Sequence, residues 1–551
     1  MQKPISLDFT ETPRDSQRKY LVIVGSLMSG LGKGIVSASI GKILQSKGIS
    51  VVPVKLDGYL NVDCGTMNPL RHGEVFVLDD GTECDMDLGT YERFLALDLH
   101  NMNNMTGGKI FKYVIEKERR GGYLGVDVQI VPHLTNEIKK WIRKVGNEFD
   151  ADVVLVEVGG TVGDLENAHF LEATRQLAIE NPGRVMFVQL TFVPTLSAVG
   201  EQKTKPTQHA TRLLQGMGIQ PDLVICREQE KLTPEARKKI SLFCNVPESN
   251  VIDDPDCETI YEVPDVFEKQ GLAELIAGKL CLKLDGEGLG KWNALVRGIK
   301  NPKKEITIGV TGKYTALKDS YVSIKEALVH AGGKLGCTAK LKWIETTEIE
   351  QDKSKLKELD SCDGIIVPGG YGSRGTEGKI ECIRYAREKG LPFLGLCFGM
   401  QLAAVEYARS VCGLKGANTT EIDPKTAYPV IDVLPEQKAI KLLGGTQRLG
   451  GYEAKLVKGT RAHAAYGADS ISERHRHRFE FNNEFRGKLE EGGLVISGTS
   501  PDGEIVEFIE WKDSFGIGTQ AHPEFKSRAE KPAPLFLAFV KAALEFNEAR
   551  K

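Results

Sequence analysis

The sequence predicts an α/β protein with two doubly wound domains, each built around a parallel sheet. Three observations support this fold class. The chain has 551 residues, too many for one hydrophobic core. Short apolar runs bounded by turn residues alternate with helical patterns, as in βα units. A polar stretch containing Gly and Pro interrupts this alternation near the middle of the chain.

The first series of elements begins at residues 20–24, an apolar run that ends in Gly25. Residues 35–47 then carry apolar side chains at helical spacing, and Gly48 follows as a helix-ending residue. Further short apolar runs predict buried parallel strands. They occupy residues 51–56, 153–158, 185–190 and 223–226.

The second series begins after the polar stretch, at residues 306–310. Its later strands are expected at residues 341–344, 364–367 and 392–396. The domain boundary is therefore placed in the polar stretch. We expect a polar N-terminal extension at 1–19, a first domain at 20–283, a linker at 284–304 and a second domain at 305–551.

Composition excludes several classes of protein. A formal net charge of −3 and 41% hydrophobic residues are typical of a soluble globular protein and argue against a basic nucleic-acid-binding surface. There is neither a membrane-spanning apolar run nor a signal-peptide pattern, so a cytoplasmic location is expected. The 11 cysteines are scattered and never spaced as C-x-x-C, which argues against a disulfide framework or a zinc ribbon.

A glycine-rich loop, Gly25 to Gly34, lies between the first strand and the first helix. Its backbone N–H groups and the helix N-terminus can hold polyphosphate oxygens, with Lys33 as a mobile positive charge. The loop is not a standard P-loop, because Gly34 replaces the usual Ser or Thr after the lysine. A glycine-rich tight turn without a ligand is the alternative interpretation.

Two acidic segments strengthen the phosphate interpretation. Residues 83–87 contain three carboxylates, and Glu157 lies within the apolar strand 153–158. A carboxylate at the end of a buried strand needs a cation or hydrogen-bond donors, and this edge of an α/β sheet is where Mg²⁺ ligands lie beside a phosphate loop. Isolated acidic residues on loops are more often simply solvated.

A third polar segment is Lys203-Thr-Lys-Pro-Thr-Gln-His209. Two lysines, two hydroxyls and an amide beside a proline can bind an anionic ligand. Taken alone, the segment also fits a solvated basic loop.

The second domain contains a nucleophile motif, Gly395-Leu-Cys397-Phe-Gly399, between a strand and an Ala- and Leu-rich helix. Small flanking residues permit the sharp turn that exposes a nucleophile at a sheet edge, and the following helix N-terminus favours the thiolate. A free cysteine is commonly a small core residue, but the turn favours catalysis here.

A general base is available at His522, with Glu524 two residues later to orient the imidazole. Backbone amides of residues 367–370 and of the residue after Cys397 can form an oxyanion hole. The segment Arg474-His-Arg-His-Arg478 contains two histidines, but its three arginines disfavour a metal. It is expected to bind an anion or a carboxylate.

Together these motifs resemble two known families. The pairing of Gly-Leu-Cys-Phe-Gly with His-Pro-Glu is similar to class I glutamine amidotransferases. The segments 29–34, 55–57, 72–76, 157–164 and 203–208 resemble the CTP synthase family. The resemblance implies a P-loop-like amidoligase domain and a flavodoxin-like glutaminase domain that make CTP from UTP, ATP and glutamine.

The resemblance also implies roles for individual residues. Cys397, His522 and Glu524 would form the catalytic triad. ATP would be bound by Gly30, Leu31, Gly32, Lys33, Gly34, Ile35, Lys55, Asp57 and Asp87, and Mg²⁺ by Asp87 and Glu157. UTP, and in part the feedback inhibitor CTP, would be bound by Ser29, Asp164, Leu165, Glu166, Lys203, Thr204, Lys205, Pro206, Thr207, Gln208 and Lys239. Glutamine would be bound by Gly370, Phe398, Gly399, Met400, Gln401, Glu421 and Arg478. His72 and Val75 would lie near an ammonia passage.

The resemblance further implies GTP as an allosteric activator, and we expect it to act through the loop at Arg374. A homotetramer, with the possibility of filaments, is expected. No nucleic-acid or membrane partner is expected. Two alternatives are an amidoligase of the same architecture with another acceptor and a catalytically silent nucleotide-sensing protein. Residues 203–208 argue against the first, and the intact Cys397, His522 and Glu524 argue against the second.

Overall fold

The computed structural model describes residues 7, 14–26, 28–67, 73–196, 200–312, 321–370, 372–433 and 447–551. The chain forms two compact units. The nucleotide unit contains Lys3–Cys64 and Asp87–Val296, and the thiol unit contains Gly65–Met86 and Arg297–Lys551. The division differs from the expected linear one, because Gly65–Met86 belongs with the C-terminal half of the chain.

The nucleotide unit is built on a seven-stranded sheet in which all strand pairs are parallel. The sheet strands, in spatial order, are β11 (Val251–Pro255), β10 (Leu223–Glu228), β7 (Val185–Phe192), β1 (Lys19–Gly25), β6 (Val153–Val158), β2 (Val51–Asp57) and β5 (Asn104–Thr106). All the strands expected in this half are present. Since every strand runs the same way, their carboxyl ends lie along one edge.

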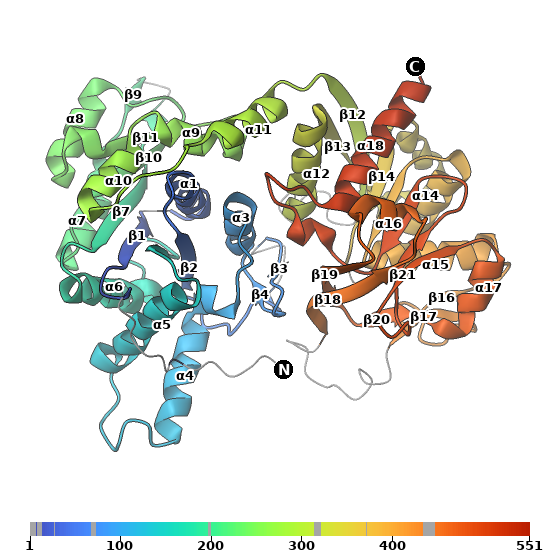
Figure 1. Ribbon diagram of the computed structural model, residues 1–551, viewed down its shortest axis with the longest axis horizontal. Helices are drawn as coiled ribbons and strands as arrows, with labels where there is room; N and C mark the ends of the chain where they lie inside the picture. Colours follow the sequence, from blue (N-terminus) through green and yellow to red (C-terminus); the bar gives the residue numbers. More distant parts are fainter. Residues whose placement is uncertain are drawn as a thin grey trace. The chain divides into compact units, whose positions relative to one another are not determined.

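Helices cover both faces of this sheet (Figure 1). The helices are α1 (Lys33–Ser46), α3 (Met86–Leu95), α4 (Gly107–Arg119), α5 (Thr135–Glu148), α6 (Ala168–Glu180), α7 (Lys205–Gly216), α8 (Pro234–Cys244), α9 (Val263–Glu268), α10 (Leu272–Leu280) and α11 (Gly290–Lys300). A short hairpin, β8 (Thr195–Leu196) with β9 (Glu201–Gln202), precedes α7. Helix α1 packs with α9 and α10, and α5 packs with α6.

The thiol unit is built on a nine-stranded sheet. Its spatial order is β13 (Cys337–Glu345), β12 (Lys304–Gly312), β14 (Gly364–Val367), β15 (Phe393–Leu396), β23 (Gly516–Thr519), β22 (Val506–Glu510), β21 (Val495–Thr499), β18 (Arg448–Leu456) and β19 (Ser470–His477). The first five strands are parallel, in the 2-1-3-4-5 chain order of flavodoxin-like folds. The expected parallel sheet is therefore confirmed, and an antiparallel extension of four strands was not anticipated.

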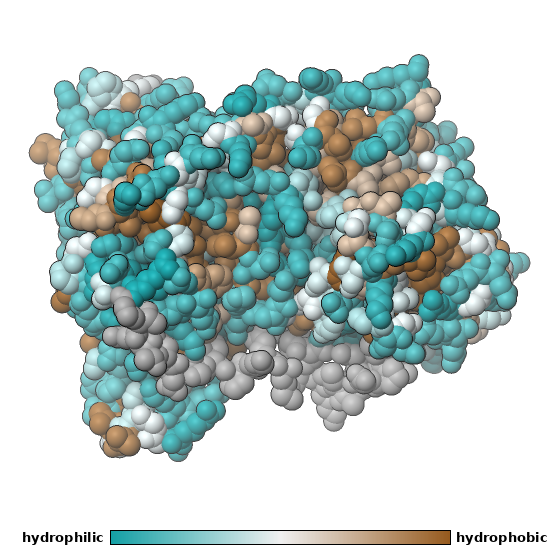
Figure 2. All heavy atoms as spheres, viewed as in Figure 1, coloured by the Kyte–Doolittle hydropathy of each residue, from teal (hydrophilic) through white to brown (hydrophobic). Residues whose placement is uncertain are grey.

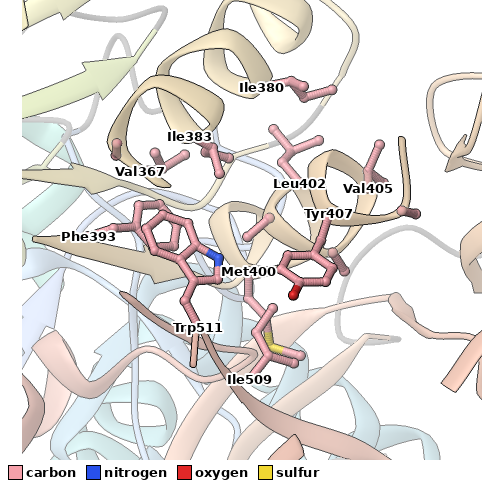
Figure 3. Packing of buried hydrophobic residues seen from close by; sticks show 14 of the residues in the cluster. Val367, Ile380, Ile383, Phe393, Met400, Leu402, Val405, Tyr407, Ile509 and Trp511 are labelled. Atoms are coloured by element: carbon pink, nitrogen blue, oxygen red, sulfur yellow. The ribbon is translucent and has the colours of Figure 1, made fainter. Parts of the chain in front are cut away.

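The other elements of this unit are β3 (Phe76–Val77), β4 (Glu83–Cys84), α12 (Val322–Leu335), α13 (Thr346–Gln351), α14 (Thr376–Lys389), α15 (Phe398–Ser410), β16 (Asn418–Thr419), β17 (Pro429–Val433), α16 (Arg461–Tyr466), β20 (Phe479–Phe481), α17 (Arg486–Glu491) and α18 (Pro534–Ala549). In Figure 3, side chains of α14 and α15 pack together over the sheet. Phe393 on β15 stacks on Trp511 with ring centroids 4.8 Å apart. This packing fixes β15 and α15, and therefore the turn between them.

Candidate active sites

The glycine-rich loop of the nucleotide unit has the backbone form that a phosphate site needs. Gly30 and Gly32 have φ of 76° and 90°, in the left-handed region that glycine adopts without strain, and α1 begins at Lys33. The Lys33 ammonium donates to the Gly160 carbonyl at 2.7 Å. Burial lowers the pKa of Lys33, while the nearby Glu157 charge opposes that shift. The loop thus presents backbone N–H groups and a lysine at one helix N-terminus.

Carboxylates gather around a second lysine, Lys55, at the end of β2. The buried Lys55 ammonium pairs with Asp87 and lies 3.5 Å from Glu157 Oε1. Its distance to Asp57 Oδ1 is 3.9 Å. Glu157 Oε2 accepts hydrogen bonds from Tyr91 and, at 3.1 Å, from Ser37. The predicted ATP- and metal-binding residues of β2, α3 and β6 therefore converge.

The two expected Mg²⁺ ligands fit a divalent cation. Glu157 Oε1 is buried and has no hydrogen-bond partner among the described residues. Burial raises the pKa of Glu157, so a nearby cation would stabilise its charged form. No cluster of three or more His, Cys, Asp or Glu suited to a metal occurs in the described ranges. Such a site, with two carboxylates, would take its remaining ligands from phosphates and water, as Mg²⁺ sites commonly do.

Gly34 explains the departure from the standard P-loop. A Cβ atom at this position would lie 2.3 Å from Asp87 Oδ1, so any side chain here would require Asp87 to move. The Ser or Thr of a standard P-loop would therefore collide with the carboxylate that pairs with Lys55. The glycine permits the close approach of α1 and α3 at this site.

The segment at residues 203–208 begins helix α7, with Pro206 in the first turn. Thr207 and Gln208 are buried and hydrogen-bonded within the unit: Thr191 Oγ1 donates to Thr207 Oγ1 at 3.0 Å, and Gln208 Nε2 donates to Thr204 Oγ1 at 3.0 Å. Lys203 pairs with Glu201 at 2.6 Å. Lys203 and the exposed Lys239 both lower the pKa of Glu201. The two lysines thus act on one carboxylate beside the N-terminus of α7.

The other expected UTP residues lie on loops after adjacent strands. Strand β1 pairs with β6 and β7, and the Val162 N–H donates to the Gly25 carbonyl at 2.9 Å. Asp164 accepts from the Thr161 N–H at 2.6 Å, while Leu165 is 86% exposed. Ser29 and Glu166 are exposed as well. These loops leave the same edge of the sheet as the glycine-rich loop.

The structure has a small pocket beside the glycine-rich loop that the sequence did not predict. It has a volume of about 70 Å³, and its lining includes Leu31, Gly32, Ile35, Arg227, Asp254 and Ile260. Burial raises the pKa of Asp254 to about 7. Arg227 and Asp254 lie on β10 and β11, in runs that look like ordinary strands, so only the parallel pairing of β10 with β11 reveals that they meet.

In the thiol unit, Cys397 has the backbone geometry of a nucleophile at a sharp turn. Its φ is 51° and its ψ −105°, in a left-handed region that non-glycine residues rarely adopt. Its N–H donates to the Thr519 carbonyl at 2.7 Å. A Cβ atom at Gly399 would lie 2.0 Å from the Val367 carbonyl oxygen, so that position requires glycine. The expected strained turn is present.

His522 and Glu524 lie at the same site. His522 Nδ1 is 2.8 Å from Glu524 Oε1. Burial disfavours the imidazolium, but the charges of Glu524 and the Cys397 thiolate together raise the pKa of His522 to about 10. A Cβ atom at Gly369 would lie 2.9 Å from His522 Cε1 and 3.6 Å from Cys397 Cβ, so the 367–370 turn directly adjoins both groups. The arrangement can support a thiolate–imidazolium pair.

Four of the expected glutamine-binding residues directly follow this thiol in the chain, and two others follow strands of the same sheet. Phe398, Gly399, Met400 and Gln401 form the first turn of α15, Gly370 follows β14 and Arg478 follows β19. Gln401 Nε2 donates to the Phe479 carbonyl at 2.8 Å, and Glu421 Oε1 accepts from the Gly372 N–H at 2.8 Å. Arg374 is exposed and Val75 is buried. His72 lies outside the described residues.

Two further features were not found from the sequence. Lys379, on α14, is 3% exposed; its ammonium donates to the Pro368 carbonyl at 3.4 Å and lies 5.4 Å from the centroid of the Phe398 ring. In the basic segment 474–478, Arg474 and Arg476 pair with Asp79 and Glu83. Two arginines of the segment that was expected to bind an anion or a carboxylate therefore pair with carboxylates of the chain itself, at residues 79 and 83.

The fold and both sites define the chain as a glutamine amidotransferase joined to a nucleotide-dependent unit. Residues 19–282 match the family model "CTP synthase N-terminus", and residues 316–542 match "Glutamine amidotransferase class-I". A CTP synthase from Carboxydothermus hydrogenoformans is 51% identical over 96% of this chain and 99% of that protein. The CTP synthase of Thermococcus gammatolerans is 52% identical over 96% and 99%, respectively.

Among solved structures, the Trypanosoma brucei CTPS glutaminase domain with bound acivicin is 31% identical, with a TM-score of 0.42. It covers 44% of this chain and 94% of that domain. The chain belongs to the CTP synthase family.

Proposed function

We infer that the chain catalyses the ATP-dependent amination of UTP to CTP, with glutamine as the nitrogen donor. Family membership supports this reaction. One observation supports the reaction at the level of residues: the chain has a candidate site for each half of it. Lysines and carboxylates lie beside the glycine-rich loop in one unit, and Cys397 lies beside His522 in the other. The test is an absorbance assay of CTP formation in which UTP, ATP and glutamine are omitted one at a time. A catalytically silent nucleotide sensor would form no CTP in the complete mixture.

The glutaminase half of the reaction is assigned to Cys397, His522 and Glu524. The Cys397 sulfur attacks the side-chain amide carbon of glutamine, and His522 gives a proton to the leaving nitrogen, so ammonia departs and a thioester remains. Water then hydrolyses the thioester to glutamate and frees the thiol. Backbone N–H groups of the 367–370 turn and of Phe398 are the proposed oxyanion donors. The Lys379 ammonium on the Pro368 carbonyl supports this role, because Pro368 C=O and Gly369 N–H belong to one peptide group.

The amination half is assigned to the nucleotide unit. The uracil 4-oxygen attacks the γ-phosphorus of ATP, ADP leaves, and ammonia then displaces the phosphate from carbon 4 to give CTP. Lys33 and the N–H groups of the glycine-rich loop would stabilise charge on the transferring phosphoryl group. Mg²⁺, when held by Asp87 and Glu157, would neutralise phosphate charge. The pocket next to the loop is proposed for the adenine base, because it is partly apolar and lies at the N-terminus of α1.

The UTP-binding role of residues 203–208, Lys239, Ser29 and 164–166 remains a proposal. The lysines beside the N-terminus of α7 support triphosphate binding there. Partial sharing of these residues by CTP would explain feedback inhibition. UTP binding can be tested separately from catalysis. In the absence of glutamine and ammonia, UTP should raise the Tm of the protein.

GTP activation is proposed to act through Arg374. The loop around it contains Gly372 and Gly375, whose φ values of 84° and 75° allow sharp turns, and it leads into α14, which carries Lys379. Arg374→Ala should weaken GTP stimulation of glutamine-dependent synthesis and leave ammonia-driven synthesis unchanged. An unaltered response to GTP would contradict the assignment.

Self-association is proposed for the nucleotide unit, with the homotetramer as the expected state. Apolar side chains between α4 and α5 are unusually exposed: Leu124 is 92%, Val126 55% and Ile130 54% exposed. Figure 2 shows hydrophobic atoms at the tip of this connection. Sedimentation of Leu124→Asp should show a smaller species than the parent. No helix in the described part of the chain is long and apolar enough to cross a membrane, and the cytoplasm is the proposed location.

A further inference from the structure

The segment at residues 73–86 is separated from the glutaminase residues by more than 300 positions, yet it packs against them in the thiol unit. It contains β3 and β4, which pair as a hairpin. Family matching assigns this segment to the synthase part of the chain, residues 19–282. We refer to it as the β3–β4 segment.

Two carboxylates of the β3–β4 segment pair with two arginines of β19. Asp79 pairs with Arg474, which is fully buried, and also lies 3.3 Å from the Lys526 ammonium. Glu83, 4% exposed, accepts from Arg476 Nε at 2.8 Å. Arginine–carboxylate pairs have directional geometry, and breaking the Asp79–Arg474 pair leaves a buried guanidinium without this partner.

The main chain of the same two arginines touches the catalytic groups. The Arg474 carbonyl accepts from the His522 N–H at 2.7 Å. The Arg476 carbonyl lies 3.8 Å from Cys397 Sγ. Each arginine therefore contacts the β3–β4 segment with its side chain and a proposed triad residue with its backbone.

An aromatic contact and a close backbone approach support the same arrangement. The Phe76 ring meets the Phe525 ring edge-on at 5.1 Å, and the Phe525 ring stacks on the His522 imidazole at 5.1 Å. The Gly451 N–H donates to the Asp79 carbonyl at 2.8 Å. At Gly450, where φ is 97°, a Cβ atom would lie 2.6 Å from that carbonyl oxygen. The segment thus contacts β18, β19 and the loop that carries His522.

From these contacts we propose that Asp79 and Glu83 are positioning residues for the glutaminase triad, supplied by the synthase part of the sequence. They hold β19 in the register that places the Arg474 and Arg476 carbonyls against His522 and Cys397. A displacement of about 1 Å at reacting groups can cost on the order of 100-fold in rate.

The test is made on the full chain with Asp79→Asn, Glu83→Gln and the double variant. We expect kcat for glutamine hydrolysis to fall about 10- to 100-fold in the double variant. The KM for glutamine should stay within about threefold, because an interaction lost only in the transition state changes kcat rather than binding. Ammonia-driven CTP synthesis should remain at the parent rate.

A matched control is Glu305→Gln, which removes one partner of an exposed ion pair, Lys340–Glu305, in the same unit. It should leave glutamine hydrolysis unchanged. A double-mutant cycle of Glu83→Gln with Arg476→Gln should be strongly non-additive, because both changes break one contact.

A purely structural role makes a different prediction. If the segment only stabilises the fold, the double variant will show a lower Tm but a parent kcat per folded molecule, or glutamine- and ammonia-driven synthesis will fall together. Either result overturns the proposal. If Asp79→Asn and Glu83→Gln reduce folding too far for assay, Gly450→Ala is a second variant, because its Cβ would displace the Asp79 main chain and with it the Asp79–Arg474 pair. Parent glutaminase kcat in folded Gly450→Ala would also overturn the proposal.

Discussion

The candidate sites of the two units differ in what defines them: side-chain charges in one and backbone conformation in the other. In the nucleotide unit the candidate site is a set of charges: Lys55 pairs with Asp87 and approaches Glu157, and Lys33 lies at the glycine-rich loop. In the thiol unit the site is set by the backbone: a positive φ at Cys397 and glycines where any Cβ would collide. The proposed phosphoryl-transfer site therefore consists mainly of paired charges, whereas the proposed glutaminase site is defined by the backbone geometry of a turn.

Removal of the nucleophile should affect the thiol unit most and spare the nucleotide unit. Cys397→Ala should reduce glutamine-dependent CTP synthesis by about 10⁴-fold or more, because the thioester route requires the sulfur. Synthesis from ammonium salts should persist and rise with pH, since more ammonia is then unprotonated. Cys412→Ala, which removes a half-buried thiol elsewhere in the same unit, is the control. Loss of both activities in folded Cys397→Ala would show that the two chemistries are not separable.

The reciprocal change in the nucleotide unit is Lys33→Ala. We expect a loss of about 10³-fold with either nitrogen source, because phosphorylation of UTP precedes the use of ammonia. Glutamate release measures whether the glutaminase site of Lys33→Ala is still active. Lys47→Ala, at the opposite end of α1 and paired with Glu268, should be close to the parent. Ammonia-driven synthesis near the parent rate in Lys33→Ala would remove Lys33 from the phosphoryl step.

A smaller effect is expected when the triad keeps its nucleophile but loses its carboxylate. Glu524→Gln should lower kcat for glutamine hydrolysis about 100-fold, because the imidazolium is no longer stabilised. The change should also alter the pH dependence of stability. The pKa of His522 is raised from 6.5 to about 10, so the stabilising contribution is complete below 6.5 and is lost as the pH rises through about 10.

The Tm difference between parent and Glu524→Gln should therefore shrink as the pH rises from about 6 to 10. A difference that stays constant over this range would mean that His522 is already neutral in the folded protein. Comparison by circular dichroism on the full chain is sufficient.

A weaker change tests the charge arrangement of the nucleotide unit. Gly34→Ser restores the standard P-loop residue, yet it should lower synthesis from ammonia about tenfold, because the new Cβ displaces Asp87 from Lys55. Gly278→Ser is the matched control, because that helical glycine has open space around it. Unchanged or higher activity in Gly34→Ser would show that Asp87 has another position in the active enzyme.

Local sequence patterns predicted most of the fold and the candidate triad. Apolar runs located the parallel strands, and Gly-Leu-Cys-Phe-Gly located the turn at Cys397, because these features are properties of adjacent residues. The sequence also predicted that Glu157 has a cation or hydrogen-bond donors beside it, because a carboxylate within an apolar strand requires a partner.

What the sequence could not predict depends on pairing between distant segments. The antiparallel strands beyond β23 look like ordinary short strands, and nothing local specifies their order. Arg227 and Asp254 meet only because β10 lies beside β11. Asp79 and Arg474 are 395 positions apart, so neither residue's neighbours reveal the contact. Lys379 resembled any lysine on an amphipathic helix until its burial was known.

The place of Gly65–Met86 in the thiol unit bears on how such enzymes can be recombined. An exchange of glutaminase halves between two relatives by a single crossover near residue 297 would replace β18 and β19 but keep the original β3–β4 segment. The partners of Arg474 and Arg476 would then come from a different parent than the arginines themselves. A hybrid gene that preserves this contact must take both the β3–β4 segment and the C-terminal half from the same parent. The glutaminase half is therefore not exchangeable as one continuous piece of sequence.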